Sequence, residues 1–138
     1  MAERLQLEVI TPERRLLSET VDSVTVPGAN GELGILPGHT PLISQLQTGV
    51  LAYTQGGTTT RLLVSGGFVE VNADRVSVLA DLAEFPEEVN AQTARAERED
   101  AERRLGTFSG TPEEMREVRT QLERATARLQ LAAENPAR

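Results

Sequence analysis

The sequence predicts an α+β protein in two segments, an N-terminal antiparallel β-sandwich followed by a C-terminal antiparallel α-helical hairpin. Apolar and polar residues alternate in the first part, as at Leu5, Leu7 and Val9, which is the period of a half-buried strand. After Pro86 the period becomes helical, and Ala, Glu and Arg dominate the composition. We therefore expect a sandwich domain at residues 1–86 and a helical domain at residues 87–138.

Short apolar runs in the first domain are separated by turn-forming residues, a spacing typical of antiparallel sandwiches. The turn signals are Thr-Pro at 11–12, Pro-Gly at 27–28, Gln-Gly-Gly at 55–57 and Asn-Ala-Asp at 72–74. Nine strands are expected between these turns, at residues 4–10, 14–18, 21–26, 33–36, 42–45, 49–54, 58–64, 67–71 and 75–80.

Two helices are expected in the second domain. The first covers residues 91–105, with Asn90 as its N-terminal cap and Gly106 at its end. The second has the stronger start signal, because Thr111-Pro112-Glu113-Glu114 combines a cap, a first-turn proline and the glutamate of a capping box.

A narrow apolar stripe on the second helix predicts that the two helices pack against each other. The stripe has the 3–4 spacing of a coiled-coil seam and consists of Met115, Val118, Leu122, Ala125, Leu129 and Ala132. The first helix offers Ala91, Ala94, Ala101 and Leu105, interrupted by Arg98. Each fully buried Leu contributes about 1.5–3 kcal/mol, whereas ordering each backbone residue costs roughly 1–2 kcal/mol. We therefore expect the hairpin to depend on docking, either to its own sandwich or to a partner.

The composition excludes several classes of function. Cysteine is absent and His39 is the single histidine, so disulfides, thiolate chemistry and His-rich metal sites are excluded, and we expect no metal. Residues 1–90 hold 5 Arg against 12 acidic residues, which disfavours nucleic-acid binding, and residues 91–138 hold 9 of each. There is no long apolar run or leader pattern, so we expect a soluble chain that stays in the compartment where it is made.

Residues 31–42, "GELGILPGHTPL", pack four turn-forming residues around the single histidine. Catalysis is disfavoured there, because neither a cysteine nor a Ser-Asp pair accompanies His39. Two interpretations stay open. In one, the glycines serve turns and His39 makes a local hydrogen bond; in the other, a rigid loop is recognised by another protein.

The same stretch carries a resemblance to a known family. "GELGILPGHTPLIS", with "LVSGGFVEVNADRVSVLAD" at 63–81 and the Arg- and Ala-rich hairpin, closely resembles the epsilon-subunit family of bacterial F-type ATP synthases, called delta in mitochondria. The resemblance implies a ten-stranded sandwich in the central stalk that links the gamma subunit to the c-ring. It also implies a non-catalytic rotor subunit that couples proton translocation to ATP synthesis. Such a subunit is peripheral, at the cytoplasmic face of the bacterial plasma membrane, and meets the membrane only through the complex.

The resemblance also implies roles for particular residues. A c-ring docking loop would contain Gly31, Glu32, Gly38 and His39. The hairpin of the family inhibits ATP hydrolysis when it extends along gamma and meets the alpha and beta subunits. The residues implied for those contacts are Arg116, Arg119, Arg124 and Arg128.

Some bacterial relatives bind ATP on the hairpin through a motif of Ile or Leu, Asp, two variable residues, Arg and Ala. The matching stretch here runs from Val89 to Ala94, but Asn90 replaces the acid and Thr93 replaces the arginine. Arg124 and Arg128 match the phosphate-facing arginines of those relatives. Since a lost charge-assisted contact costs about 1.5–3 kcal/mol, we expect nucleotide binding that is weak or absent, and no other cofactor.

Two alternatives from other classes remain open. One is a free-standing β-sandwich that binds a ligand and uses the helical hairpin for dimerisation. The other is a small enzyme, which the lack of cysteine and of further histidines disfavours.

Overall fold

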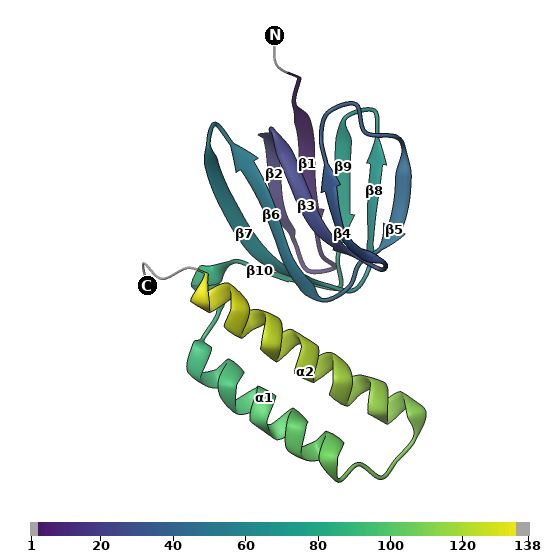
Figure 1. The fold of residues 1–138 in the computed structure, drawn as a ribbon, viewed down its shortest axis with the longest axis vertical. Coiled ribbons are helices and arrows are strands. Elements are labelled where there is room, and N and C mark those ends of the chain that lie inside the picture. The colour runs from purple at the N-terminus through teal and green to yellow at the C-terminus, as the bar shows by residue number, and fades with distance from the viewer. Residues whose placement is uncertain (1–2, 135–138) are drawn as a thin grey trace. The chain divides into compact units, whose positions relative to one another are not determined.

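The computed structural model describes residues 3–134 and divides into two compact units, Met1–Glu84 and Phe85–Arg138. The first unit contains ten strands, and the second contains a short 3₁₀ helix and two α-helices (Figure 1). The division falls two residues before the boundary expected from the sequence.

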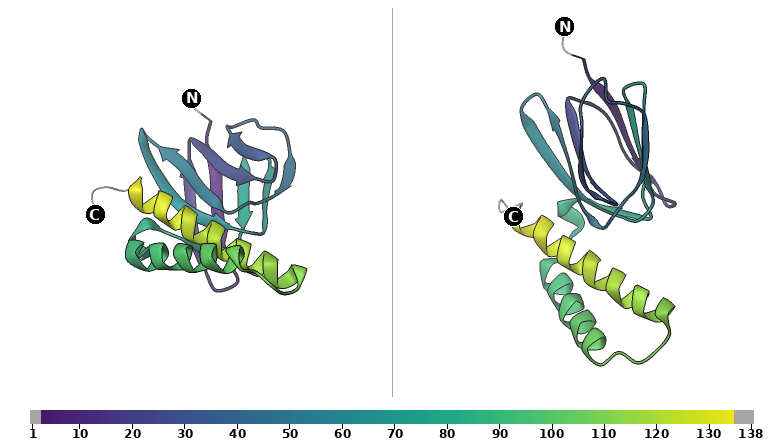
Figure 2. Two further views of the ribbon diagram at one scale, coloured as in Figure 1. Left: turned by 60° about the horizontal axis from the view of Figure 1, so that its bottom comes forward. Right: turned by 45° about the vertical axis from the view of Figure 1, so that its right-hand side comes forward.

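The first unit is a sandwich of two five-stranded sheets, seen as two layers in Figure 2. The first sheet has the strand order β2-β1-β9-β8-β5, and the second has the order β10-β7-β6-β3-β4. The strands are β1 Leu5–Ile10, β2 Arg15–Val21, β3 Ser23–Gly28, β4 Gly31–Ile35, β5 Leu42–Gln45, β6 Gly49–Gln55, β7 Thr58–Ser65, β8 Phe68–Asn72, β9 Arg75–Leu79 and β10 Leu82–Glu84.

The nine expected strands are all present, and two details differ from the expectation. The sandwich is not wholly antiparallel, because β1 and β9 pair in parallel from Gln6 with Arg75 to Ile10 with Leu79. Strands that far apart in sequence need no hairpin between them, so turn signals cannot reveal the direction of their pairing. The tenth strand, β10, has only three residues, which is too short to display a period.

Alternation of burial explains how the sandwich forms its core. Leu5, Leu7 and Val9 are fully buried, while the residues between them are half-buried. The C-terminal half of β7 is buried at four successive positions, from Leu62 to Ser65. Both sheets therefore bury one apolar face against the other, which makes the sandwich a complete hydrophobic core in its own right.

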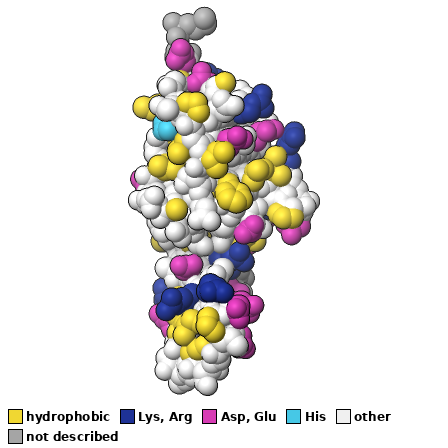
Figure 3. Space-filling view, turned by 90° about the vertical axis from the view of Figure 1, so that its right-hand side faces the viewer, with side chains coloured by type: hydrophobic (Ala, Val, Ile, Leu, Met, Phe, Trp, Pro, Cys, Tyr) yellow, Lys and Arg dark blue, Asp and Glu magenta, His cyan; other side chains and the backbone are white. Residues whose placement is uncertain are grey.

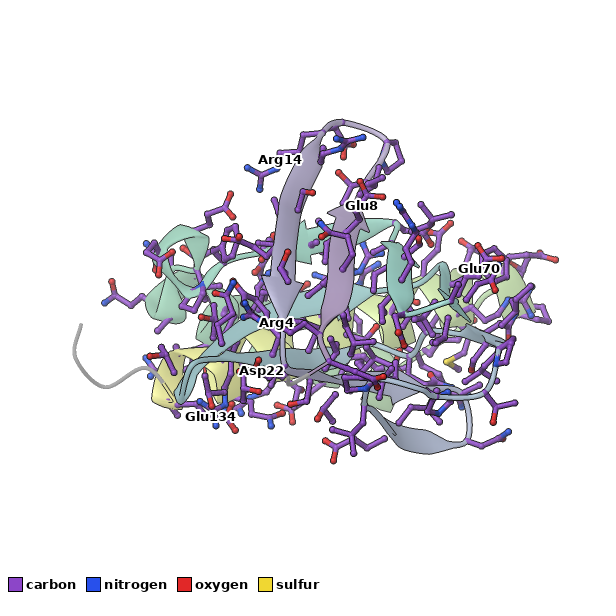
Figure 4. The ribbon with its side chains drawn as sticks, turned by 90° about the horizontal axis from the view of Figure 1, so that it is seen from above. Arg4, Glu8, Arg14, Asp22, Glu70 and Glu134 are labelled. Carbon is purple, nitrogen blue, oxygen red and sulfur yellow. The ribbon has the colours of Figure 1, made fainter. Side chains whose placement is uncertain are left out.

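Asp22 joins three segments at one end of the sandwich. Its Oδ1 lies 3.1 Å from Arg4 Nε, and its Oδ2 accepts a 2.8 Å hydrogen bond from Gly56 N–H. Figure 4 shows Arg4 beside Asp22, next to strand β1. The start of β1, the β2–β3 corner and the β6–β7 turn are thus linked through one carboxylate.

The second unit contains the 3₁₀ helix η1 Pro86–Glu88 and the helices α1 Ala91–Gly106 and α2 Pro112–Ala133. Both expected caps are confirmed. The side chain of Asn90 accepts a 2.9 Å hydrogen bond from Thr93 N–H. Thr111 and Glu114 form the reciprocal capping box, with hydrogen bonds of 3.1 and 2.8 Å. These local bonds satisfy amides that the first turns leave free.

The helix–helix seam is only partly buried. The buried residues of α1 are Ala94 and Ala101, and those of α2 are Val118, Ala125, Ala127 and Leu131. Ala127 and Leu131 lie outside the expected stripe, whose other members, Met115, Leu122, Leu129 and Ala132, are only half-buried. Arg98 interrupts the α1 side, and its buried Nε has no hydrogen-bond partner among residues 3–134. A buried donor without a partner costs about 1–3 kcal/mol, so this seam holds the hairpin weakly.

The capping box makes a testable prediction about pH. Hydrogen bonds from the backbone and side chain of Thr111 lower the pKa of Glu114. A lowered folded-state pKa means that the cap contributes fully above the ordinary glutamate pKa and is lost as the pH falls through the lowered value. We expect a ¹³C NMR titration of the full chain to place the Glu114 carboxyl midpoint below the ordinary glutamate pKa. In Thr111→Ala the midpoint should move toward the ordinary value without reaching it, because the hydroxyl is lost while the backbone N–H of residue 111 remains. A Glu114 midpoint at or above the ordinary glutamate value in the unsubstituted chain would contradict this.

Candidate docking surfaces

The β3–β4 hairpin forms a polar tip. Gly31 is the first residue of β4 and pairs with Gly28, and Glu32 pairs with Pro27. Gly31 has φ of +117°, a conformation that L side chains rarely adopt, so glycine is needed at this turn. Gly31 and Glu32 are both exposed. The tip therefore presents backbone and one carboxylate to solvent.

The β4–β5 connection, residues 36–41, is a separate feature. His39 N–H donates to Leu36 O at 3.1 Å, and His39 Nδ1 lies 2.7 Å from Thr40 O. Gly38 has φ of +85°, and its N–H donates a 2.8 Å hydrogen bond to Asp74 Oδ1 in the β8–β9 turn. The connection is thus held both by its own bonds and by a bond to another turn.

The structure corrects the expectation of a single docking loop. Gly31 and Glu32 lie at the start of β4, whereas Gly38 and His39 follow its end, so a whole strand separates the pairs. Five residues of strand place Gly31 and Ile35 roughly 13 Å apart. Figure 1 shows the two connections at opposite ends of the sandwich. A strand was expected at residues 33–36 within this stretch, and it is present as β4, an edge strand of the second sheet that begins at Gly31 and so includes Gly31 and Glu32.

An exposed apolar surface, missed in the sequence, lies on the outer face of the first sheet. Phe68 of β8 pairs directly with Leu79 of β9, and Ile43 of β5 is diagonal to Phe68. The exposed fractions are 50% for Phe68, 49% for Leu79 and 69% for Ile43. Figure 3 views the side of the sandwich that carries β5 and β8, where hydrophobic side chains (yellow) gather among charged ones. We call Ile43, Phe68 and Leu79 the outer patch.

A shallow groove of about 390 Å³ borders the outer patch. Its lining residues are Pro41, Leu42, Ile43, Glu70, Val71 and Asn72. Leu36, in the β4–β5 connection, is also exposed, at 63%. The sequence contained a signal for this surface, since Leu42-Ile43, Phe68-Val69 and Val78-Leu79 are adjacent apolar pairs. Because neighbouring strand residues face opposite sides, one member of each pair must leave the core.

The four arginines expected to make regulatory contacts do not share one face of α2. Arg116 and Arg119 are exposed, whereas Arg124 and Arg128 are half-buried. At 100° per residue their positions spread over roughly half of the helix circumference. Arg128 Nη1 lies 3.7 Å from Glu97 Oε1 of α1. Of these four arginines only Arg116 and Arg119 are exposed, and Arg116 Nη2 lies 3.8 Å from Glu113 Oε1.

The residues of the expected nucleotide motif are spread along the hairpin. Asn90 uses its side-chain oxygen to cap α1. The Arg128–Glu97 ion pair places these two residues side by side in the antiparallel hairpin. Thr93 and Arg124 each lie four residues away from the pair, in opposite directions, so they are about 12 Å apart along the helix axis. Arg124 and Arg128 line an open groove of about 600 Å³ with Arg116 and the acids Glu97, Glu113 and Glu117. Three cations and three carboxylates give this groove no excess positive charge for a polyphosphate.

Two classes of site are not found in the described part of the chain. No group of three or more His, Asp or Glu side chains within residues 3–134 is arranged to hold a metal ion. No helix in the same range is long and apolar enough to cross a membrane.

Comparisons with known proteins decide the family. Residues 4–86 match the family model of the ATP synthase delta/epsilon chain β-sandwich domain. The ATP synthase epsilon chain of Syntrophobacter fumaroxidans is 45% identical over 132 residues, which cover 96% of this chain and 98% of the relative. The epsilon chain of Geotalea uraniireducens is 41% identical over 133 residues, covering 96% of each. The chain belongs to the ATP synthase epsilon family.

Solved structures share the fold of this chain. A chain of the Euglena gracilis mitochondrial ATP synthase, in a structure of OSCP, F1 and c-ring, superposes with a TM-score of 0.79 at 24% identity, covering 98% of this chain and 82% of that one. A chain from the Tetrahymena thermophila central stalk and c-ring gives a TM-score of 0.66 at 14% identity, covering 94% and 97%. The resemblance and the sandwich-plus-hairpin fold are thus confirmed. As a member of the epsilon family, the chain is a non-catalytic subunit of ATP synthase.

Proposed function

We propose that this epsilon-family chain joins the gamma subunit to the c-ring in the central stalk and so couples proton translocation to ATP synthesis. The observation that carries this proposal is the likeness to epsilon chains across 96% of the chain, sandwich and hairpin together. A module that binds a ligand on its own would not need both parts in the same order. The place of action is the cytoplasmic face of the plasma membrane, reached through the complex.

Because the two ends of β4 are separate, we propose a different partner for each. The tip at Gly31 and Glu32 is polar, and it suits the polar loops of the c-ring. The opposite end, with Gly38 and His39, carries the exposed Leu36 and lies on the same edge of the sandwich as Ile43. Apolar side chains in contact with one another on a surface favour burial against a protein partner. We therefore assign this end and the outer patch to gamma.

The hairpin is proposed to act as a brake on ATP hydrolysis. Its seam buries few large side chains and includes the unpartnered Nε of Arg98, so two poses can differ by only a few kcal/mol. In the extended pose Arg116 and Arg119, which are exposed, would meet acidic residues of the alpha and beta subunits. Arg124 and Arg128 would join them only after leaving their positions beside α1.

Nucleotide binding to the hairpin is expected to be weak or absent. The Asn90 side chain caps α1, Thr93 replaces a phosphate-binding arginine, and the groove around Arg124 and Arg128 carries balanced charge. Isothermal titration of the full chain with Mg-ATP should give a dissociation constant well above the low micromolar range. A low micromolar value would contradict this expectation.

Co-purification tests the proposed function against the main alternative. Gentle extraction of membranes, followed by capture of the tagged chain, should recover gamma and c-ring subunits, with alpha and beta subunits alongside. Recovery of a lone dimer of this chain would instead support a free-standing ligand-binding module.

A substitution in the outer patch tests the proposed contact with gamma more directly than co-purification does. Phe68→Glu should weaken binding of purified gamma at least tenfold, because a charge would be buried against the apolar patch. The melting temperature should change little, since Phe68 lies on the solvent side of β8. Thr59→Glu, exposed on β7 of the other sheet, is the matched control and should bind as the unsubstituted chain does. Unchanged affinity of Phe68→Glu would remove the outer patch from the interface.

A further inference from the structure

The β8–β9 turn has a strained backbone and carries the carboxylate of Asp74. Ala73 and Asp74 have φ of +51° and +62°, so two non-glycine residues adopt the left-handed conformation in succession. Two-residue hairpin turns of this kind favour Asn-Gly or Asp-Gly, which makes the second position the usual site of glycine. A glycine at 74 would relieve the strain, but it would bring no side chain to the turn.

The Asp74 side chain connects this turn to the β4–β5 connection. Its Oδ1 accepts the Gly38 N–H at 2.8 Å, across 36 residues of sequence. Its backbone carbonyl accepts the Gln6 N–H at 2.9 Å, which fixes the turn to the start of β1. The carboxylate is therefore attached to the frame of the first sheet and holds an amide of a connection that leaves the second sheet.

The other hydrogen bonds of residues 36–41 do not provide the same restraint. His39 N–H to Leu36 O and His39 Nδ1 to Thr40 O both join neighbours within the connection. They set its local shape but not its position relative to the sheets. Gly38 is exposed and has φ of +85°, and a Cβ added to it would meet no atom within 4 Å, so no neighbouring side chain covers it on that side. The charge-assisted bond to Asp74 therefore positions the connection.

We propose that Asp74 is a positioning residue, which holds the Leu36–His39 segment in the conformation that docks to gamma. The proposal rests on the proposed assignment of this end of the sandwich to gamma. The free chain then meets its partner with the connection already ordered, so less conformational freedom is lost on binding. The polar tip at Gly31 and Glu32, beyond the other end of β4, is not affected.

Two substitutions at one position separate the carboxylate's role from turn strain. Asp74→Gly removes the acceptor and relieves the positive φ, whereas Asp74→Asn retains an Oδ1 acceptor and tolerates the left-handed conformation. Ala73→Gly relieves strain and leaves Asp74 in place, so it is the matched control. The measurements are amide hydrogen exchange of Gly38 in the full chain, and affinity for the purified gamma subunit.

Asp74→Gly should lose protection of the Gly38 amide and bind gamma roughly tenfold more weakly, without a lower melting temperature. Asp74→Asn should restore Gly38 protection and stay within about twofold of the unsubstituted affinity. Ala73→Gly should bind normally.

Three outcomes would overturn the proposal. Asp74→Gly could expose the Gly38 amide yet bind gamma normally, or the Gly38 amide could stay protected in Asp74→Gly. Alternatively, Asp74→Asn could bind as weakly as Asp74→Gly. A wrong assignment of this end of the sandwich to gamma would give a different result. In that case His39→Ala and Phe68→Glu would also bind gamma with normal affinity, whether or not the Gly38 amide is protected in Asp74→Gly.

Discussion

Gly67→Ala is expected to lower the free energy of unfolding of the sandwich by about 3–5 kcal/mol, combining left-handed strain with overpacking. Gly67 has φ of +87°, and a Cβ there would overlap Leu79 O and lie 3.0 Å from Ala80 Cα. These are backbone atoms of the neighbouring strand and its end, so no side-chain rotation can relieve the clash. Gly67 O also accepts the Leu46 N–H at 2.9 Å, which limits how far residue 67 can move. Urea unfolding of the full chain, followed by NMR signals of the sandwich, measures the change.

Gly34→Ala is the matched control for this substitution. Gly34 lies in β4 without a positive φ, and an added Cβ meets no atom within 4 Å. Its replacement should change the free energy of unfolding by less than about 1 kcal/mol. A loss below about 1 kcal/mol for Gly67→Ala would show that the β7–β8 connection rearranges easily, and would contradict a rigid close approach between residue 67 and the end of β9.

Deleting residues 85–138 is expected to leave a folded sandwich that still assembles, and to raise ATP hydrolysis by the complex. The core of the sandwich is formed by its own two sheets, from residues such as Leu5, Leu51 and Leu62. If the inhibitory pose of the hairpin is favoured by about 1 kcal/mol, it occupies roughly five sixths of complexes, and its removal raises hydrolysis roughly sixfold. Steady-state hydrolysis and proton-driven synthesis by the reconstituted complex are the measurements.

A milder variant keeps the hairpin in place. Arg116→Ala with Arg119→Ala removes the two exposed cations of α2 and should raise hydrolysis in the same direction, by a smaller factor. Synthesis should be unchanged in both variants. If hydrolysis equals that of the unsubstituted complex after deletion of residues 85–138, the hairpin has no inhibitory role in this protein.

The parts of the fold that depend on local chemistry could be predicted from sequence. Alternation located nine strands, and the capping residues Asn90 and Thr111 located the starts of both helices. The parallel pairing of β1 with β9 could not be predicted, because it depends on how the chain crosses between sheets. β10 was missed because its three residues are ordered mainly by pairing with β7.

The candidate sites show the same division between local and long-range information. The family resemblance implied that Gly31 and Gly38 share one docking loop, but most of the edge strand β4 lies between them. The Gly38–Asp74 bond joins residues 36 apart, and nothing in either local sequence indicates it. The members of the outer patch are neighbours only because of the register in which β5, β8 and β9 pair, and the sequence alone does not reveal that register. The interruption of the seam at Arg98 was visible in sequence, but its unpartnered Nε was not.

Hydrogen exchange of the isolated full chain tests the central claim most directly, which is that a self-sufficient sandwich carries a hairpin of much lower stability. Amides of β1, β6 and β7 should exchange only on global unfolding of the sandwich, whereas those of α1 and α2 should exchange through local opening, orders of magnitude faster. Arg98→Met should slow exchange in both helices, since it removes the unpartnered donor from the seam. Helix amides protected as strongly as those of the sandwich, in the chain alone, would contradict the claim that the hairpin can change its pose.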